Sequence, residues 1–397
     1  MDSVSDRLAK LSSSATLAMS QKSSELKAQG VDVINMSVGE PDFFTPDHIK
    51  EAAKQAIDNN YSFYSPVPGY PALRNAIVEK LKKENGLDYK AAQIICSNGA
   101  KQAVNNVLLS IINPGDEVIV PAPYWVSYVE MVKLAEGTNV IVNGEIENDF
   151  KITPAQLEAA ITPKTKAIIL CSPSNPTGSV YTKTELQGLA EVLAKYPRII
   201  VLSDEIYEHI NYIGKHVSIA EFEAIRDRVV IINGVSKAYA MTGWRIGWIA
   251  APQWIASACN KLQSQYTSGP CSVSQKAAEA AYTGTQKPVK DMCIAFQKRR
   301  DLIVGLAQDI PGLKTVKPEG AFYIFPDCSF FFGKSFGEHK INNPEDLALY
   351  LLDEAHVASV GGTSFGAPNC LRFSYAISEE NIHKAMQRVS DALAKLS

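Results

Sequence analysis

Five short apolar runs mark the first two thirds of this chain of 397 residues. They lie near residues 94, 118, 168, 200 and 230. Helical patterns separate them, and this alternation predicts an α/β fold whose sheet is mostly parallel. Such folds collect their ligands just beyond the carboxyl ends of the strands, so these ends are where we look for a site.

The length of the chain is too great for one small core and suits two domains that share one ligand site. We expect residues 1–45 to contribute to a small domain, 46–290 to form a large ligand-binding domain, and 291–397 to form a small C-terminal α+β domain. The segment 328–339, rich in Phe and Gly, predicts either a lid or a loop on a dimer surface.

Composition narrows the class of protein. With 46% hydrophobic and 20% charged residues, the chain is typical of a globular enzyme, and its net charge of -3 gives no basic surface for nucleic acid. The polar stretch Met1–Arg7 is followed by no apolar core of signal-peptide length, and no apolar run is long enough to span a membrane. These features favour a cytoplasmic protein.

Cysteine and histidine spacing indicates neither disulfides nor a metal. The seven cysteines are scattered without a C-x-x-C pair, as expected for reduced thiols in the cytoplasm. The six histidines show no H-E-x-x-H or comparable spacing, so we predict no metal site.

We expect two cationic segments to have a structural role only. One is the helix 72–83, with Lys and Glu on its outer face. The other is Arg299-Arg300, which we expect on a solvated helix face.

The stretch from Ser236 to Gly247 follows the apolar run at 229–232. Lys237 stands just past that predicted strand, eight residues before Arg245. Apolar and cationic neighbours disfavour an ammonium ion, so they would lower the pKa of Lys237, and a neutral amine can attack an aldehyde. Arg245 would present a planar fork that suits a phosphate dianion. The alternative for these two residues alone is an ordinary surface pair.

A second anion site is predicted where the run at 94–96 meets the following helix. Strand, glycine turn and helix start place free backbone N–H groups and the positive end of a helix dipole together at Gly99 and Ala100. No nucleotide-binding glycine motif is present, so a nucleotide is not indicated. Lys101 lies in the first helical turn, where a cation opposes the dipole, and this favours a functional role.

The pattern Ser-Lys-x-x-x-x-x-Gly-x-Arg-x-Gly at 236–247 resembles the lysine signature of fold-type I aminotransferases that use pyridoxal 5'-phosphate. Met241–Arg245 is close to the form in the bacterial-type (class I, subgroup Ib) aspartate aminotransferases, a subgroup that also contains prephenate aminotransferases. The string S-P-x-N-P-T-G at 172–178 and the stretch G-E-P-D-F at 39–43 agree with the same family. Matching motifs occur in the family's order across nearly the whole chain.

This resemblance implies a cofactor site. Lys237 would be the Schiff-base lysine and later the general acid/base. Trp125 would stack on the pyridine ring, although core packing is the rival explanation. Asn175 and Tyr207 would contact the ring's O3', Asp204 would pair with the protonated ring nitrogen, and the phosphate would contact the residues Gly99, Ala100, Lys101, Ser236 and Arg245. Gly234 stands where some branches carry a phosphate-binding serine, and the neighbouring Ser236 is our candidate in its place.

The resemblance also implies a substrate site and a dimer. Arg372 would form a bidentate pair with the substrate α-carboxylate, beside Gly39. Lys101 would bind the side-chain carboxylate of a dicarboxylic substrate. Ser14 and Thr16 would either help with this distal carboxylate or cap their own helix. Trp125 and Asn175 would also contact the substrate.

Tyr64 would reach the cofactor phosphate of a partner subunit, which implies a homodimer with shared active sites.

The sequence therefore predicts ping-pong transamination between L-aspartate or glutamate and 2-oxoglutarate or oxaloacetate. A bifunctional aspartate/prephenate aminotransferase fits the same motifs, because both substrates offer two carboxylates. A C–S lyase or another amino-acid aminotransferase is disfavoured by the lysine predicted to bind a dicarboxylate. A non-enzymatic effector-sensing domain is disfavoured because no helix-turn-helix pattern and no basic patch occur.

Overall fold

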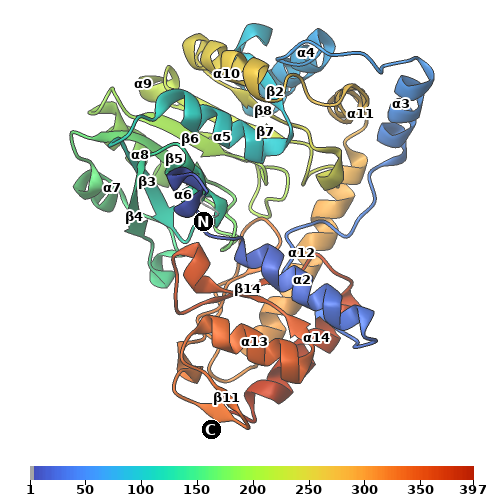
Figure 1. Ribbon diagram of the computed structural model, residues 1–397, viewed down its shortest axis with the longest axis vertical. Coiled ribbons are helices and arrows are strands. Elements are labelled where there is room, and N and C mark those ends of the chain that lie inside the picture. The colour runs from blue at the N-terminus through green and yellow to red at the C-terminus, as the bar shows by residue number, and fades with distance from the viewer. Residues whose placement is uncertain (1–3) are drawn as a thin grey trace.

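The computed structural model describes residues 4–397; the first three residues of the polar amino terminus lie outside the described part. The chain forms a large unit around a seven-stranded sheet and a smaller unit around a three-stranded sheet (Figure 1). The long helix α12 (Lys287–Gln308) runs between the two units. This arrangement is the α/β architecture expected from the sequence.

The large sheet is parallel except for one strand. Its strands, from edge to edge, are β2 (Ile94–Ser97), β8 (Gly247–Ala250), β7 (Val229–Gly234), β6 (Ile200–Asp204), β5 (Thr165–Cys171), β3 (Glu117–Ala122) and β4 (Thr138–Asn143). Strand β8 is antiparallel to both of its neighbours, and the β3, β4, β5, β6 and β7 pairings are parallel. The sequence analysis missed β4 and β8: β4 is largely solvent-facing, and β8 directly continues the lysine motif.

Successive residues of each strand face opposite sides of this sheet, so two separate cores form. In β7, Val230 and Ile232 belong to one core, whereas Val229 and Ile231 belong to the other. The first core is covered by α5 (Gly99–Ile111), α6 (Ser127–Leu134) and α10 (Gln253–Tyr266). The second is covered by α3 (Asp47–Asp58), α4 (Pro71–Lys80), α7 (Pro154–Ala160), α8 (Lys183–Ala194), α9 (Glu223–Arg226) and α11 (Ser272–Thr283).

The small unit combines segments from both ends of the chain. Strand β1 (Ile34–Asn35) pairs in parallel with β12 (Val357–Ala358), which joins the amino-terminal segment to the carboxyl-terminal one. The remaining elements are α2 (Ala15–Ala28), α13 (Pro344–Ala355), α14 (Glu379–Leu393) and the antiparallel sheet β13 (Val360–Gly361), β14 (Leu371–Ser374), β9 (Tyr323–Ile324). One apolar core contains residues of α2, α12, α13 and α14. The exact domain boundaries remain a prediction.

The segment 328–339, predicted as a lid or a dimer-surface loop, lies against the carboxyl terminus of the chain. It folds into a short 3-10 turn and the hairpin of β10 (Ser335–Phe336) and β11 (His339–Lys340). The Ser335 backbone N–H donates to the Ser397 carbonyl at 2.9 Å, so the hairpin lies against the carboxyl terminus (Figure 1). Both the lid and the dimer-surface loop stay predictions.

Among residues 4–397, no helix combines the length and the apolar character needed to cross a membrane.

Candidate active site

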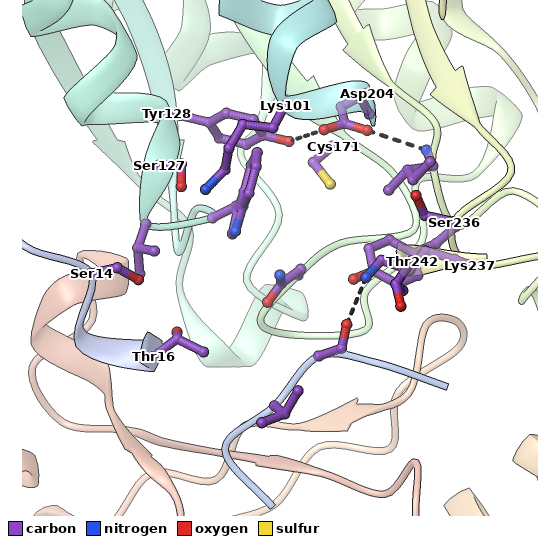
Figure 2. A pocket seen from close by; sticks show the side chains of 18 of the residues that line it. Ser14, Thr16, Lys101, Ser127, Tyr128, Cys171, Asp204, Ser236, Lys237 and Thr242 are labelled. Carbon is purple, nitrogen blue, oxygen red and sulfur yellow. Dashed lines mark hydrogen bonds between the residues drawn. The ribbon is translucent and has the colours of Figure 1, made fainter. Parts of the chain in front are cut away.

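A cavity of about 360 Å³ lies at the carboxyl ends of the parallel strands, and residues of the small unit complete its wall. Nearly all of the residues predicted from the sequence line it (Figure 2). They are Ser14, Thr16, Gly39, Ala100, Lys101, Trp125, Asn175, Asp204, Tyr207, Ser236, Lys237, Arg245 and Arg372. Gly99 lies directly behind this lining, whereas Tyr64 lies apart, with its side chain 99% exposed.

Lys237 follows β7 and points into the cavity. Its amine donates a hydrogen bond to the Gly39 carbonyl at 2.6 Å, across 198 positions of the chain. The pKa of Lys237 is lowered to about 8, mainly by burial; the cations Arg372 and Arg245 act in the same direction, against the opposing fields of Glu40 and Asp204. The amine therefore loses its proton far more easily than an exposed lysine, as the sequence predicted.

Two cations meet at the amino terminus of α5. Arg245 donates to the Thr242 carbonyl at 2.9 Å and the Asn98 carbonyl at 3.2 Å. A side chain at Gly99 would collide with its guanidinium, so the glycine permits the close approach. Desolvation lowers the pKa of Lys101, and the positive charge of Arg245 lowers it further. Two cations at the positive end of a helix dipole form a setting that an anion would stabilise.

Arg372 lies at the small-unit wall and is 2% exposed. It donates to Asn175 Oδ1 at 2.8 Å and to the Ser37 carbonyl at 2.6 Å, while its Nε has no partner among the described residues. Its guanidinium stacks 4.7 Å from the Tyr323 ring centroid. Burial lowers the pKa of this arginine. A buried cation with an unused donor is well suited to receive a carboxylate.

Asp204 ends strand β6 and is 3% exposed. Its Oδ1 accepts the Ile206 backbone N–H at 3.2 Å, and its Oδ2 accepts the Tyr128 hydroxyl at 2.6 Å. Burial raises the pKa of Asp204 to about 6, although these two hydrogen bonds favour its ionised form. Three residues on, the Tyr207 hydroxyl is hydrogen-bonded to that of Tyr323 at 2.7 Å.

Trp125 and Lys101 form the opposite wall, where the Lys101 ammonium lies 5.0 Å from the indole centroid. Ser14 stands at the amino terminus of α2, but its side chain makes no capping hydrogen bond. The capping alternative for Ser14 is therefore wrong, and its hydroxyl is available at the cavity. Thr16 lines the same side of the cavity in the first turn of α2 (Figure 2).

The sequence analysis missed several lining residues, which are Tyr128, Cys171, Thr242 and Tyr323. Tyr128 could have been found, because it follows Trp125 by three residues at the start of a helix. Tyr323 could not have been found from a local pattern, since its contact with Tyr207 spans 116 positions.

The prediction of a solvated Arg299-Arg300 pair was wrong. Arg299 forms an ion pair with Asp42 at 2.6 Å, and its side chain is only 11% exposed. Arg300 is buried, donates to the Pro318 carbonyl at 3.1 Å and stacks 4.7 Å from the Tyr212 ring centroid. Both arginines therefore hold neighbouring segments against α12.

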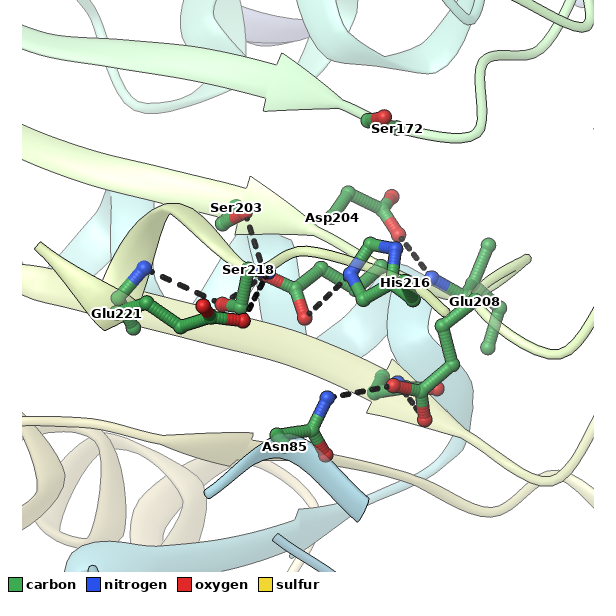
Figure 3. Close-up of polar contacts among 12 residues, drawn as sticks. Asn85, Ser172, Ser203, Asp204, Glu208, His216, Ser218 and Glu221 are labelled. Atoms are coloured by element: carbon green, nitrogen blue, oxygen red, sulfur yellow. Dashed lines mark hydrogen bonds and ion pairs between the residues drawn. The ribbon is translucent and has the colours of Figure 1, made fainter. Parts of the chain in front are cut away.

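A buried polar network lies behind Asp204 (Figure 3). Lys80, at the end of α4, forms an ion pair with Glu208 and donates to Asn85 Oδ1 at 2.9 Å. Lys80 and Asn85 are five residues apart, and the π-helical turn Leu81–Asn85 aligns such a pair on one face. Glu208 also accepts the Asn233 amide at 3.0 Å and that of Asn85 at 3.1 Å.

This network departs from one expectation, because the sequence placed Lys80 on a solvated face, but its side chain is 2% exposed. Glu205, Glu208 and His216 lie close enough to share an ion, and the expected absence of a metal site stays a prediction. Glu208 pairs with Lys80, and His216 Nε2 lies 3.0 Å from a carboxylate oxygen of Glu205.

The chain matches the family model described as aminotransferase class I and II over residues 31–389. It belongs to that family. As a member of this aminotransferase family, it is an enzyme of the transaminase class, in agreement with the resemblance seen in its motifs.

Named relatives of this family member cover almost its whole length. It is 48% identical, over 99% of its length and 83% of the other chain, to the bifunctional aspartate aminotransferase and glutamate/aspartate-prephenate aminotransferase of Petunia hybrida. Its fold matches the aspartate aminotransferase of Rhizobium meliloti with a TM-score of 0.96 and 41% identity over the full length of both chains. It matches that of Thermus thermophilus with maleate with a TM-score of 0.93 and 41% identity, over 99% of this chain and 100% of the other.

Proposed function

We propose that this protein is a pyridoxal 5'-phosphate-dependent aminotransferase that moves an amino group between L-aspartate, or glutamate, and a dicarboxylic keto acid. The observation that carries the proposal is the buried Lys237 amine, which shares one cavity with Arg372 on one wall and Lys101 on another. An easily deprotonated amine between two carboxylate-binding cations fits a dicarboxylic amino acid.

The residues present fit the cofactor. The amino terminus of α5 with Arg245 would hold its phosphate, together with Gly99, Ala100, Lys101 and Ser236. Asp204 would face the pyridine nitrogen, Asn175 and Tyr207 would contact O3', and Trp125 would stack on the ring. Arg372 donates to the amide oxygen of Asn175, so among residues 4–397 the amide N–H groups stay available to donate. When bound, pyridoxal phosphate supplies an electron sink for charge that develops at the substrate α-carbon.

Lys237 then acts as the general acid/base that moves a proton at the substrate α-carbon. Its lowered pKa favours this work, because a base is most effective when its pKa lies near the working pH. Arg372 and Gly39 would hold the α-carboxylate, and this fixes which face of the α-carbon Lys237 meets. Lys101, with Thr16 and Ser14, would hold the distal carboxylate.

A homodimer would complete the site. Phe63 and Tyr64 are 81% and 99% exposed on the loop after α3, although aromatic side chains are usually largely buried. We place this loop against a second copy of the chain, with Tyr64 directed to the partner's phosphate site. The seven free cysteines suit a reducing compartment, and we assign the protein to the cytoplasm.

A dual activity on prephenate is the second candidate, because the Petunia hybrida relative is named for both activities. Prephenate also carries two carboxylates, so Arg372 and Lys101 would serve both substrates. Rates with prephenate and 2-oxoglutarate as competing acceptors separate the two functions.

Replacing Lys101 by methionine tests the dicarboxylate role. We expect kcat/KM for aspartate to fall roughly 10- to 150-fold, since a hydrogen bond to a charged group contributes about 1.5–3 kcal/mol, while the value for alanine changes little. Arg372→Lys is the matched comparison, because it should weaken both donors alike. Steady-state kinetics with both donors, on enzyme saturated with cofactor, give the answer.

Lys101→Arg, which keeps the charge, should retain most aspartate activity. Equal losses for aspartate and alanine in Lys101→Met would contradict the assigned role. No turnover of aspartate by the wild-type enzyme would contradict the proposed function itself.

A further inference from the structure

The carboxylate of Asp204 has one side-chain donor among residues 4–397, the hydroxyl of Tyr128. Its other oxygen accepts a backbone N–H, that of Ile206. At 2.6 Å, the distance between the Tyr128 hydroxyl and Asp204 Oδ2 is in the range of charge-assisted hydrogen bonds (Figure 2). The orientation of this carboxylate therefore depends on Tyr128.

The ring of Tyr128 is itself held rigidly. It is 1% exposed and belongs to the core between the sheet and helices α5, α6 and α10. The Trp125 ring packs edge-on against it, with centroids 5.3 Å apart, and the Tyr128 backbone N–H donates to the Trp125 carbonyl at 2.9 Å. The hydroxyl is thus presented from a fixed helix start, where it donates to Asp204 and lies beside the Cys171 thiol.

We propose that Tyr128 is a positioning residue for the cofactor: it holds the Asp204 carboxylate, as an anion, in the orientation that meets the pyridine nitrogen. This inference rests on the proposed function and adds to it a residue that acts through Asp204. A phenol can do this because it remains a donor at every working pH; burial and the neighbouring Asp204 raise the pKa of Tyr128 well above its usual value.

The protonation state of Asp204 depends on this hydrogen bond. The pKa of Asp204 is raised to about 6, mainly by burial; the Glu205 carboxylate acts in the same direction, whereas the Tyr128 hydroxyl, the Ile206 N–H and Lys237 act against it. The Cys171 thiol is neutral, because burial raises its pKa to about 12. Removing the Tyr128 donor therefore raises the pKa of Asp204 toward neutrality, and a protonated carboxyl no longer pairs with a pyridinium.

Tyr128→Phe in the holoenzyme tests the proposal, because it removes the hydroxyl and keeps the ring that packs on Trp125. We expect the affinity for pyridoxal phosphate to fall roughly 10- to 100-fold at pH 6 and clearly less at pH 8.5, where Asp204 is ionised again. In the pH dependence of kcat/KM, the apparent pKa on the acidic side (the acid limb) should rise by roughly one to two pH units.

Tyr124→Phe is the matched control, since the Tyr124 hydroxyl makes no hydrogen bond among the described residues. In this variant, the affinity for pyridoxal phosphate and the acid limb of the kcat/KM profile should stay unchanged. Tyr128→His, which keeps a ring N–H donor, should restore part of the affinity at pH 6. It also serves as the test variant if Tyr128→Phe fails to fold, with Tyr128→Leu as its donor-free counterpart.

A merely structural role would lower the melting temperature without any pH-dependent loss of cofactor. A pH-independent loss, or unchanged affinity and acid limb in Tyr128→Phe, would overturn the inference. These results are separable from a failure of the proposed function, which would show itself as absence of cofactor binding by the wild-type chain.

Discussion

Replacing Lys237 by alanine lowers turnover of aspartate by at least about 10²–10⁴-fold, the usual contribution of a general acid/base, while the protein still folds and binds the cofactor. The loss is expected because no other amine of the cavity lining is placed like Lys237, whose burial and cationic neighbours bring its pKa to about 8. Single-turnover kinetics with aspartate and cofactor-saturated enzyme measure it.

Two further variants sharpen the test of Lys237. Lys237→Arg keeps the charge but cannot give up its proton, so it should be as inactive as the alanine variant. Lys195→Ala removes a lysine that is 57% exposed, and should keep full activity. Added small primary amines should restore part of the turnover of Lys237→Ala. Near-normal activity of Lys237→Ala without added amine would remove this lysine from the mechanism.

Replacing Lys80 by methionine should lower the free energy of unfolding by about 3–5 kcal/mol, the range for breaking a buried ion pair from one side. Both partners are almost inaccessible, with side chains 2% and 4% exposed for Lys80 and Glu208. Burial alone would raise the pKa of Glu208, but the Lys80 ammonium, with His209 and His216, lowers it well below its usual value. Without Lys80, an uncompensated carboxylate would remain in the core.

Urea unfolding at several pH values measures this effect and checks its cause. In the wild type, Glu208 contributes stability that is present above its unfolded pKa, near 4.5, and is lost as the pH falls below it. In Lys80→Met, burial should raise the pKa of Glu208 above its value in the unfolded chain. The destabilisation caused by the ionised Glu208 should therefore decrease as the pH falls from 8 toward 4.5.

Lys83→Met, on an exposed position of the adjoining π-helical turn, is the control and should change stability little. The double variant Lys80→Met/Glu208→Gln should recover part of the loss. A loss below about 1 kcal/mol in Lys80→Met, within the range of an exposed pair, would show that this buried network is not structural.

Part of the candidate site could be predicted because several of the residues that line the cavity lie at or just past the carboxyl ends of apolar strands. Asp204 and Lys237 could be placed from this rule alone, since the carboxyl ends of neighbouring parallel strands meet at one edge of the sheet. The motif resemblance added the residues of the small unit, such as Arg372, which no periodicity connects to the strand ends.

What escaped prediction depends on contacts between distant segments. Lys80 has an ordinary place in a helical charge pattern, and only its partner 128 positions away makes it a core residue. Arg299 pairs with Asp42 across 257 positions, and Tyr128 acquires its role from Asp204, 76 positions on. Pairings at such separations are set by the fold, and a local pattern in the sequence carries no sign of them.

The absorption spectrum of the purified holoenzyme, recorded before and after addition of L-aspartate without any keto acid, tests the central claim most directly. We predict that the band of the bound cofactor converts to that of its aminated form, and that a stoichiometric amount of keto acid appears. A cofactor band that aspartate leaves unchanged would contradict the assignment of aspartate as the amino donor.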